Sequence, residues 1–183
     1  MSAESLHASA VDVLSTWAPA DRGDESLRHT MLAFLGSAPR GCLREHEPGH
    51  LTASALVLDE SGANVLLTLH PRVGRWIQLG GHCEESDETV LDAALREATE
   101  ESGIAELRVD SGLLSAHTHP ITCSLGVPTR HLDLQFLVWA PDDAAVVRSV
   151  ESVDLAWWPL DGLPAGAEHE TLDRLIALAR ARG

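Results

Sequence analysis

The stretch from Gly80 to Ile104, GGHCEESDETVLDAALREATEESGI, carries the clearest structural signal in the chain. Its second half is typical of an amphipathic helix, because apolar residues recur at helical spacing: Val90, Leu91, Ala94, Leu95 and Ala98. Ser86 or Asp87 is expected to cap the start of this helix. Gly103 is expected to end it, since glycine readily adopts the left-handed conformation of a helix C-terminus. The stretch therefore predicts one helix that follows a glycine turn.

Three glutamates of this helix, Glu97, Glu100 and Glu101, lie within one turn. At about 100° per residue, Glu97 and Glu101 border the apolar stripe and Glu100 lies one step outside it. Their like charges repel, so they form either a solvated acidic face or the ligands of a divalent cation. The preceding Gly80 and Gly81 favour the second interpretation, because glycine lets the backbone approach a ligand and a helix start favours anions. Oxygen ligands beside a phosphate-binding turn suit Mg²⁺ or Mn²⁺.

The sequence REATEESGI, residues 96–104, resembles the REUxEExGU half of the Nudix box, in which U is an aliphatic residue. Glu88 precedes its arginine by seven intervening residues, as the box requires. The glycine end differs, because the position of the box glycine is His82 and the glycine is Gly81, so the loop is one residue longer. With the flanking strands, the resemblance extends over residues 51–183.

This resemblance implies an α/β fold, an α/β/α sandwich with a mixed sheet. It also implies a divalent-metal-dependent hydrolase that cleaves a pyrophosphate bond in a nucleoside diphosphate linked to another moiety. Arg96, which is spaced to pair with Glu100, would orient the helix carboxylates. The proton of the attacking water would pass to one of the helix glutamates or to Glu151, near the last strand. The implied metal ligands are Glu97, Glu100, Glu101 and the carbonyl group of Gly81.

A second group of residues is expected to contact the substrate. Arg72 and Arg75 precede the glycine turn, and arginine suits bidentate contacts with phosphate, although an exposed arginine is often only solvated. The predicted substrate-binding set is Arg72, Arg75, Gly80, Gly81 and Glu88. The partner is then a small nucleotide-type molecule.

Composition excludes several other classes of protein. The formal net charge of −15, from 28 acidic and 13 basic residues, argues against a nucleic-acid-binding surface. There is no apolar run long enough to span a membrane and no signal-peptide pattern, so no membrane partner is expected. Cys42, Cys83 and Cys123 are scattered, which is typical of reduced thiols in a cytoplasmic protein.

The rest of the chain predicts the following organisation. Residues 1–48 form a helical extension of two packed helices, which caps the active site or makes a dimer contact, so the protein is a monomer or a homodimer. Residues 49–183 form the Nudix domain. It should begin with a hairpin of strands 51–59 and 65–70 and end with a strand within 146–158 and a helix at 168–182.

Histidines suggest a second metal site. Segments 113–121 and 131–140 read as paired strands, and alternation places His119 near Asp133, with His131 on the same face. Together with His82, these side chains would suit zinc or another transition metal. The alternatives are that the histidines bind substrate phosphate or simply pack. The predicted second site comprises His82, His119, His131 and Asp133.

Two other functions are compatible with parts of the sequence. The isopentenyl-diphosphate isomerase branch of the superfamily holds its metal with a histidine in a Gly-His turn and an ExE pair, which His82 and the His131-x-Asp133 pair resemble. Gly80 stands where that enzyme has its catalytic cysteine, and Cys83 is displaced, which argues against isomerisation. A non-catalytic module that senses a nucleotide or sugar nucleotide is the other alternative. The intact glutamates argue against it, because a sensor does not need the metal ligands.

Overall fold

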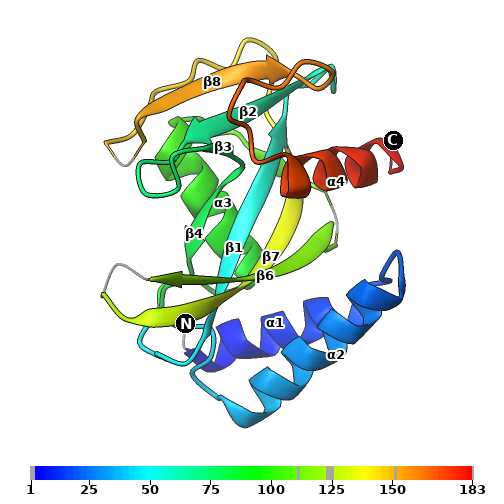
Figure 1. Ribbon diagram of the computed structural model, residues 1–183, viewed down its shortest axis with the longest axis vertical. Helices are drawn as coiled ribbons and strands as arrows, with labels where there is room; N and C mark the ends of the chain where they lie inside the picture. The colour runs from blue at the N-terminus through cyan, green and yellow to red at the C-terminus, as the bar shows by residue number, and fades with distance from the viewer. Residues whose placement is uncertain (1–2, 111, 123–125, 151, 183) are drawn as a thin grey trace.

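The computed structural model describes residues 3–110, 112–122, 126–150 and 152–182. They form a curled mixed sheet with helices on both faces (Figure 1), so the predicted α/β fold is confirmed. Strand β1 (His50–Leu58) lies at the centre and pairs in parallel with β7 (Pro128–Trp139). Antiparallel pairing adds β2 (Asn64–Leu69), β3 (Trp76–Ile77), β4 (Leu79–His82), β5 (Arg108–Val109), β6 (Ser115–Thr122) and β8 (Asp154–Pro159).

One edge of β1 is shared by two partners. Strand β4 pairs with residues 52–55 of β1, and β2 pairs with residues 57–58. The β1–β2 pairing confirms the predicted hairpin, whereas the short strands β3, β4 and β5 were not predicted, because two to four residues are too few to show a periodicity. The pairing with β4 brings the glycine turn against the middle of the sheet.

Strand β1 shows how the sequence divides between the two faces of the sheet. Its odd-numbered residues pack in clusters with α1 (Ala3–Thr16), α2 (Arg22–Ser37) and α3 (Val90–Ser102), while Leu56 and Leu58 pack with α4 (His169–Arg180) on the other face. The even-numbered residues at the start of β1 are instead polar: His50, Thr52 and Ser54. Since α4 covers only the apolar half of its face, these polar residues are available to line a cavity.

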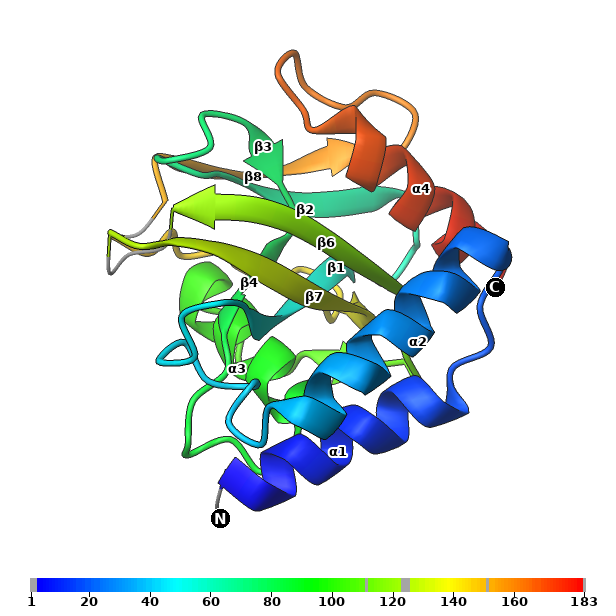
Figure 2. The same ribbon diagram turned by 60° about the horizontal axis from the view of Figure 1, so that its bottom comes forward.

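The two N-terminal helices are built as predicted and pack on the sheet. They run side by side in opposite directions (Figure 2), and Leu6, Leu14, Met31 and Leu35 belong to one core cluster with β1, β7 and α3. The Ser9 hydroxyl also accepts a 3.0 Å hydrogen bond from the amide of Val90, which ties α1 to the start of α3. The extension therefore supports the helix that carries the glutamates.

The caps of α3 differ in part from the prediction. Thr89, rather than Ser86 or Asp87, is the N-cap, and it forms a capping box with Asp92. Gly103 is the C-cap with φ 72°, as predicted. Because Thr89 caps the helix, the side chain of Asp87 is available for another contact. No helix in the described part of the chain is both long and apolar enough to cross a membrane.

Candidate active site and histidine cluster

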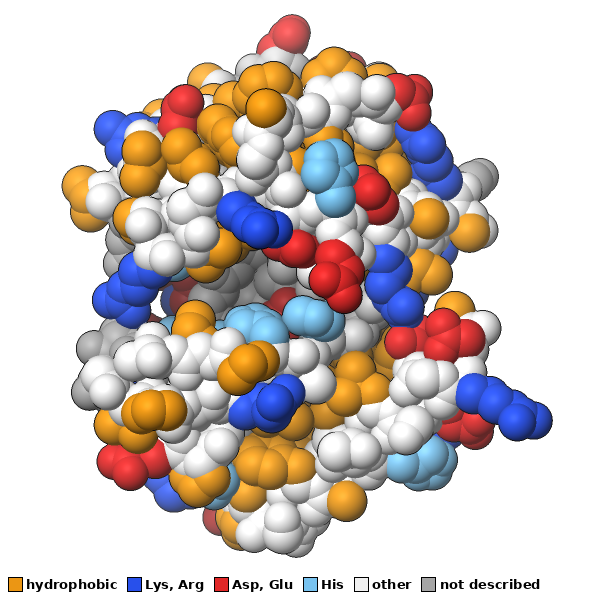
Figure 3. Space-filling view, in the orientation of Figure 1, with side chains coloured by type: hydrophobic (Ala, Val, Ile, Leu, Met, Phe, Trp, Pro, Cys, Tyr) orange, Lys and Arg blue, Asp and Glu red, His pale blue; other side chains and the backbone are white. Residues whose placement is uncertain are grey.

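A cavity of about 520 Å³ lies between the polar half of the sheet, the end of α3 and the loop that follows β2. It opens on the face shown in Figure 3, where basic, histidine and acidic side chains gather around the opening. Most of the predicted site residues line it: Arg72, Gly80, Gly81, His82, Arg96, Glu97, Glu100, Glu101, His119, His131 and Asp133.

Three predicted residues lie elsewhere or outside the described chain. Arg75 and Glu88 are not among the described residues that line the cavity; Arg75 lies 3.8 Å from Glu168, and Glu88 is exposed in the loop before α3. Glu151, the alternative proton acceptor, falls outside the described residues. The roles given to these three residues stay predictions.

We call Glu97, Glu100 and Glu101 the carboxylate wall of the cavity. They differ in burial: the residue Glu101 is 6 % exposed, whereas the side chains of Glu97 and Glu100 are 14 % and 61 % exposed. The amide of Gly80 donates a 2.9 Å hydrogen bond to Glu101 Oε2. The wall thus runs from a carboxylate fixed in the interior to one at the rim.

The two glycines of β4 allow close packing on both sides of the strand, of β1 against Gly80 and of α3 against Gly81. At Gly80, where φ is 148°, a Cβ atom would lie 2.5 Å from Ser54 Cα and 2.7 Å from the carbonyl oxygen of Ala53. At Gly81, a Cβ atom would lie 2.6 Å from the carboxyl carbon of Glu97. Any other residue would therefore displace either the strand or the carboxylate wall.

Arg96 holds the carboxylate wall in place. Its Nη1 atom lies 3.1 Å from Glu97 and 3.2 Å from Glu100, and its Nη2 atom donates to the carbonyl of His82 at 2.9 Å. The other partner is Asp87, whose two oxygens accept from Arg96 Nε and Nη2 at 2.9 and 3.0 Å. The hydrogen bond to Asp87 is the main cause that raises the pKa of Arg96. The predicted pair with Glu100 exists, but the buried Asp87 is a second anchor that the sequence did not indicate.

The carboxylate wall fits a hard divalent cation. Its donors are carboxylate oxygens from one helix turn, and the amide of Gly80 fixes the buried carboxylate of Glu101 in place. Such oxygen-rich sites suit Mg²⁺ and Mn²⁺. The residues present therefore match the cation that the sequence resemblance implies.

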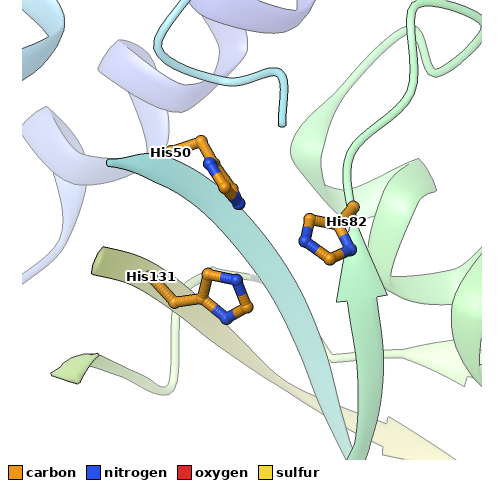
Figure 4. A group of neighbouring side chains, drawn as sticks. All are labelled: His50, His82 and His131. Carbon is orange, nitrogen blue, oxygen red and sulfur yellow. The ribbon is translucent and has the colours of Figure 1, made fainter. Parts of the chain in front are cut away.

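Histidines form another part of the cavity wall. His50, His82 and His131 project from β1, β4 and β7 toward one another (Figure 4), and one ligand atom of each lies within 4.8 Å of those of the other two. We call these three residues the histidine cluster. The sheet register assembles it, because β7 places His131 beside His50 and β4 places His82 beside Thr52.

The histidine cluster differs from the predicted four-residue set. It contains His82 and His131 but adds His50, which the sequence analysis missed. His119 lies opposite His131 in the β6–β7 pair, not opposite Asp133, so the predicted register was two residues off; an even shift leaves the side chains on the same face. Asp133 is bound instead by the hydroxyls of Thr52 and Ser54, at 2.9 and 2.7 Å.

Burial keeps these imidazoles neutral. It lowers the pKa of His82 to about 4 and that of His131 to about 3, and it also lowers the pKa of His50 and of His119. Repulsion from the neighbouring histidines lowers the pKa of His82 and of His131 further. The positive charges of Arg44 and Arg72 act in the same direction on His82. At neutral pH the histidines therefore carry lone pairs rather than charge.

The described cysteines do not offer a nucleophile to this cavity. Cys83 is buried and is not among the described residues that line the cavity, and burial raises its pKa well above the usual value. Burial also raises the pKa of Cys42 to about 12. Both thiols therefore stay protonated, and Cys123 falls outside the described residues.

Several residues of the cavity were not predicted from the sequence. Arg44 lines it from the connection between α2 and β1, where no sequence pattern marks it. His50, Thr52 and Ser54 did carry a signal, because they are polar residues at every second position of an otherwise apolar strand. The predicted strand began at residue 51, which left His50 out.

Comparisons with known proteins agree with this geometry. The family model described as the NUDIX domain matches residues 48–179. The chain belongs to the Nudix family. A search of curated proteins found no match.

Several solved structures share the fold. A Nudix-family hydrolase from Clostridium perfringens is 22% identical, with a TM-score of 0.56 over 73% of this chain and 98% of that one. An Ap4A hydrolase from C. elegans is also 22% identical, with a TM-score of 0.55 over 72% of this chain and 96% of that one. The NUDIX domain of Shewanella oneidensis NrtR, solved with ADP ribose, is 22% identical, with a TM-score of 0.51 over 72% of this chain and 86% of that one. At these identities, the likeness shows the fold alone.

Proposed function

We propose that the chain is a pyrophosphohydrolase that cleaves a nucleoside diphosphate linked to another moiety, with Mg²⁺ or Mn²⁺ as cofactor. The observation that carries this proposal is the convergence of Glu97, Glu100 and Glu101 with the Gly80–Gly81 turn on one cavity. A site that only bound a nucleotide has no need of three clustered carboxylates, whose mutual repulsion costs stability. Ap4A and ADP ribose, named with two of the similar structures, both contain linked phosphates.

The carboxylate wall and the carbonyl of Gly81 would hold the cation. When bound, the cation neutralises the diphosphate and lowers the pKa of a coordinated water. The chain's own residues position the carboxylates and accept the proton. Arg96 keeps Glu97 and Glu100 in position, and Asp87 keeps Arg96 in position. One of the glutamates of the wall accepts the proton of the attacking water.

Two arginines at the cavity are suited to the substrate phosphates. Arg44 and Arg72 both line the cavity and are exposed, so their guanidinium groups can turn toward a bound anion. They face a site whose other charges are largely carboxylates. The two arginines would neutralise the substrate phosphates that the metal does not contact, and they would orient the substrate for cleavage.

A release assay tests the proposal. The purified chain is incubated with dinucleoside polyphosphates, ADP ribose, sugar nucleotides and nucleoside triphosphates, with Mg²⁺, with Mn²⁺ or with chelator, and phosphorus-containing products are quantified. We expect metal-dependent cleavage of a linked diphosphate that is lost in Glu100→Gln and Glu101→Gln. Tight binding of one compound without any product would instead indicate a sensor module. Isopentenyl diphosphate is assayed separately, and its isomerisation would support the isomerase alternative.

A further inference from the structure

We infer that His50, His82 and His131 bind one transition-metal ion of the zinc type, with an open coordination position that faces the cavity. This site is separate from the carboxylate wall, and its existence does not depend on the proposed hydrolase function. Three observations carry it: the convergence of the rings, the buried Nε2 atoms of His50 and His131 that have no hydrogen-bond partner in the described chain, and the position of the cluster between the interior and the cavity.

The three rings lie close together, two pairs tilted against each other and the His82–His131 pair T-shaped. The ring centroids are 5.0 Å apart for His50 and His131, 5.2 Å for His50 and His82, and 5.1 Å for His82 and His131. A tetrahedral ion with bonds of about 2.1 Å holds its nitrogens about 3.4 Å apart. Because the ligand atoms already lie within 4.8 Å, small rotations of the rings bring them into range.

Two nitrogens of the cluster are buried and, within the described chain, have no hydrogen-bond partner: Nε2 of His50 and Nε2 of His131. His50 is only 1 % exposed, so bulk solvent does not reach its ring. A buried polar atom without a partner is costly, and such atoms are rare in folded proteins. A metal ion between the rings satisfies both nitrogens at once.

The tautomer of His50 is fixed in the form that binds a metal. Its Nδ1 atom lies 3.3 Å from the carbonyl oxygen of His46. A carbonyl oxygen only accepts, so Nδ1 carries the proton and donates it, and Nε2 keeps its lone pair. A backbone carbonyl behind a ligating histidine is the usual arrangement that orients the ring toward a metal.

The geometry leaves the fourth position on the side of the cavity. His82 and His131 line the cavity, while His50 lies behind them on β1. An ion between the three therefore has protein on the His50 side and space for a water or a substrate oxygen on the other. Three protein ligands and one open position are typical of catalytic rather than structural zinc. The buried carboxylate of Asp133, on the same face of β7, supplies nearby negative charge.

Imidazole ligands distinguish this site from the carboxylate wall. Neutral nitrogen donors suit zinc, cobalt, nickel and copper, whereas oxygen donors suit magnesium and manganese. The two sites should therefore fill independently with different ions. Cobalt is the appropriate probe, because its visible absorption reports on the ligands.

The experiment uses the full chain without a polyhistidine tag, treated with chelator and dialysed. Co²⁺ is titrated in millimolar Mg²⁺, followed by visible absorption, and Zn²⁺ is then added to displace it; bound metal is measured by elemental analysis. We expect one equivalent of Co²⁺ with the absorption of a nitrogen-ligated tetrahedral or five-coordinate ion, displaced by one equivalent of Zn²⁺. His82→Ala and His131→Ala should each weaken binding at least ~100-fold.

Matched variants make the result decisive. His29→Ala removes an exposed histidine of α2 and should leave the titration unchanged, as should Glu100→Gln of the carboxylate wall. His50→Gln is a third test of the cluster, and circular dichroism checks that each variant folds. Co²⁺ binding that is absent, that survives in the His82→Ala, His131→Ala double variant, or that is lost in Glu100→Gln instead would overturn the inference.

Discussion

The carboxylate wall and the histidine cluster share one cavity but are assembled in opposite ways. The carboxylate wall comes from one turn of α3, so the helical period alone brings Glu97, Glu100 and Glu101 together. The histidine cluster comes from three strands, and His50 and His131 meet only because β1 and β7 pair in parallel. A site within one helix can be predicted from the sequence, whereas a site between strands depends on the register in which the strands pair. The four predictions below test whether the two also act separately.

The largest effect should come from the buried end of the carboxylate wall. Glu101→Gln keeps the size of the side chain and its ability to accept from Gly80, but it removes the charge that would hold a cation. We expect kcat to fall at least ~10²-fold, which is the loss typical when electrostatic stabilisation of a transition state is removed. Initial rates at saturating Mg²⁺, on the substrate found in the release assay, measure it.

The control for this prediction is Glu106→Gln, which removes an exposed carboxylate beyond the end of α3. Its turnover should match that of the parent chain. If Glu101→Gln turned over as fast as Glu106→Gln, the carboxylate wall would be no more than a solvated acidic face.

The glycine turn should be the next most sensitive position, because both parts of the site depend on it. Gly80→Ala places a Cβ atom against the backbone of β1, so we expect the free energy of unfolding to fall by about 2–3 kcal/mol. Gly74→Ala is the matched control, since Gly74 also has a positive φ of 67° but no heavy atom lies within 4 Å of an added Cβ. It should cost about 1 kcal/mol. Urea denaturation measures both, and equal losses would contradict the proposed close packing.

Binding of the hard cation should stabilise the folded chain through the carboxylate wall alone. At free Mg²⁺ of ~10 times its Kd, the free energy of unfolding should rise by about 1.4 kcal/mol. This gain should vanish in Glu101→Gln and persist in His82→Ala, which alters only the histidine cluster. Thermal melts with and without Mg²⁺ measure it. A gain that disappeared in His82→Ala would mean that the two sites are coupled.

The smallest effect should come from the residue that positions Arg96. Asp87→Asn keeps the shape of the side chain but removes the charge that anchors the guanidinium group. We expect kcat to fall about threefold to tenfold, which corresponds to ~1 kcal/mol, with restoration in Asp87→Glu. Glu85→Gln, which disrupts the exposed ion pair with Arg40, is the control and should change nothing. A fall in Glu85→Gln of the same size would point to a general charge effect.

Sequence patterns determined the elements whose contacts are local. The amphipathic period located α3 and the two N-terminal helices, strand-like runs located β1 and β6, and clean alternation located β7. The family motif then implied the α/β fold. These inferences succeeded because hydrophobic periodicity reflects which side of one element is buried, and each element carries that information in its own residues.

Tertiary structure decided which residues meet across the sheet. The parallel pairing of β1 with β7 brought His50 into the histidine cluster, and the β6–β7 register placed His119 beside His131 rather than Asp133. The loop before α3 placed Asp87, and not Glu88, against Arg96. Strand register and loop path are set by the combined burial of many distant side chains. For that reason the sequence by itself specified the carboxylate wall, whereas only the folded sheet specified which histidines form the histidine cluster.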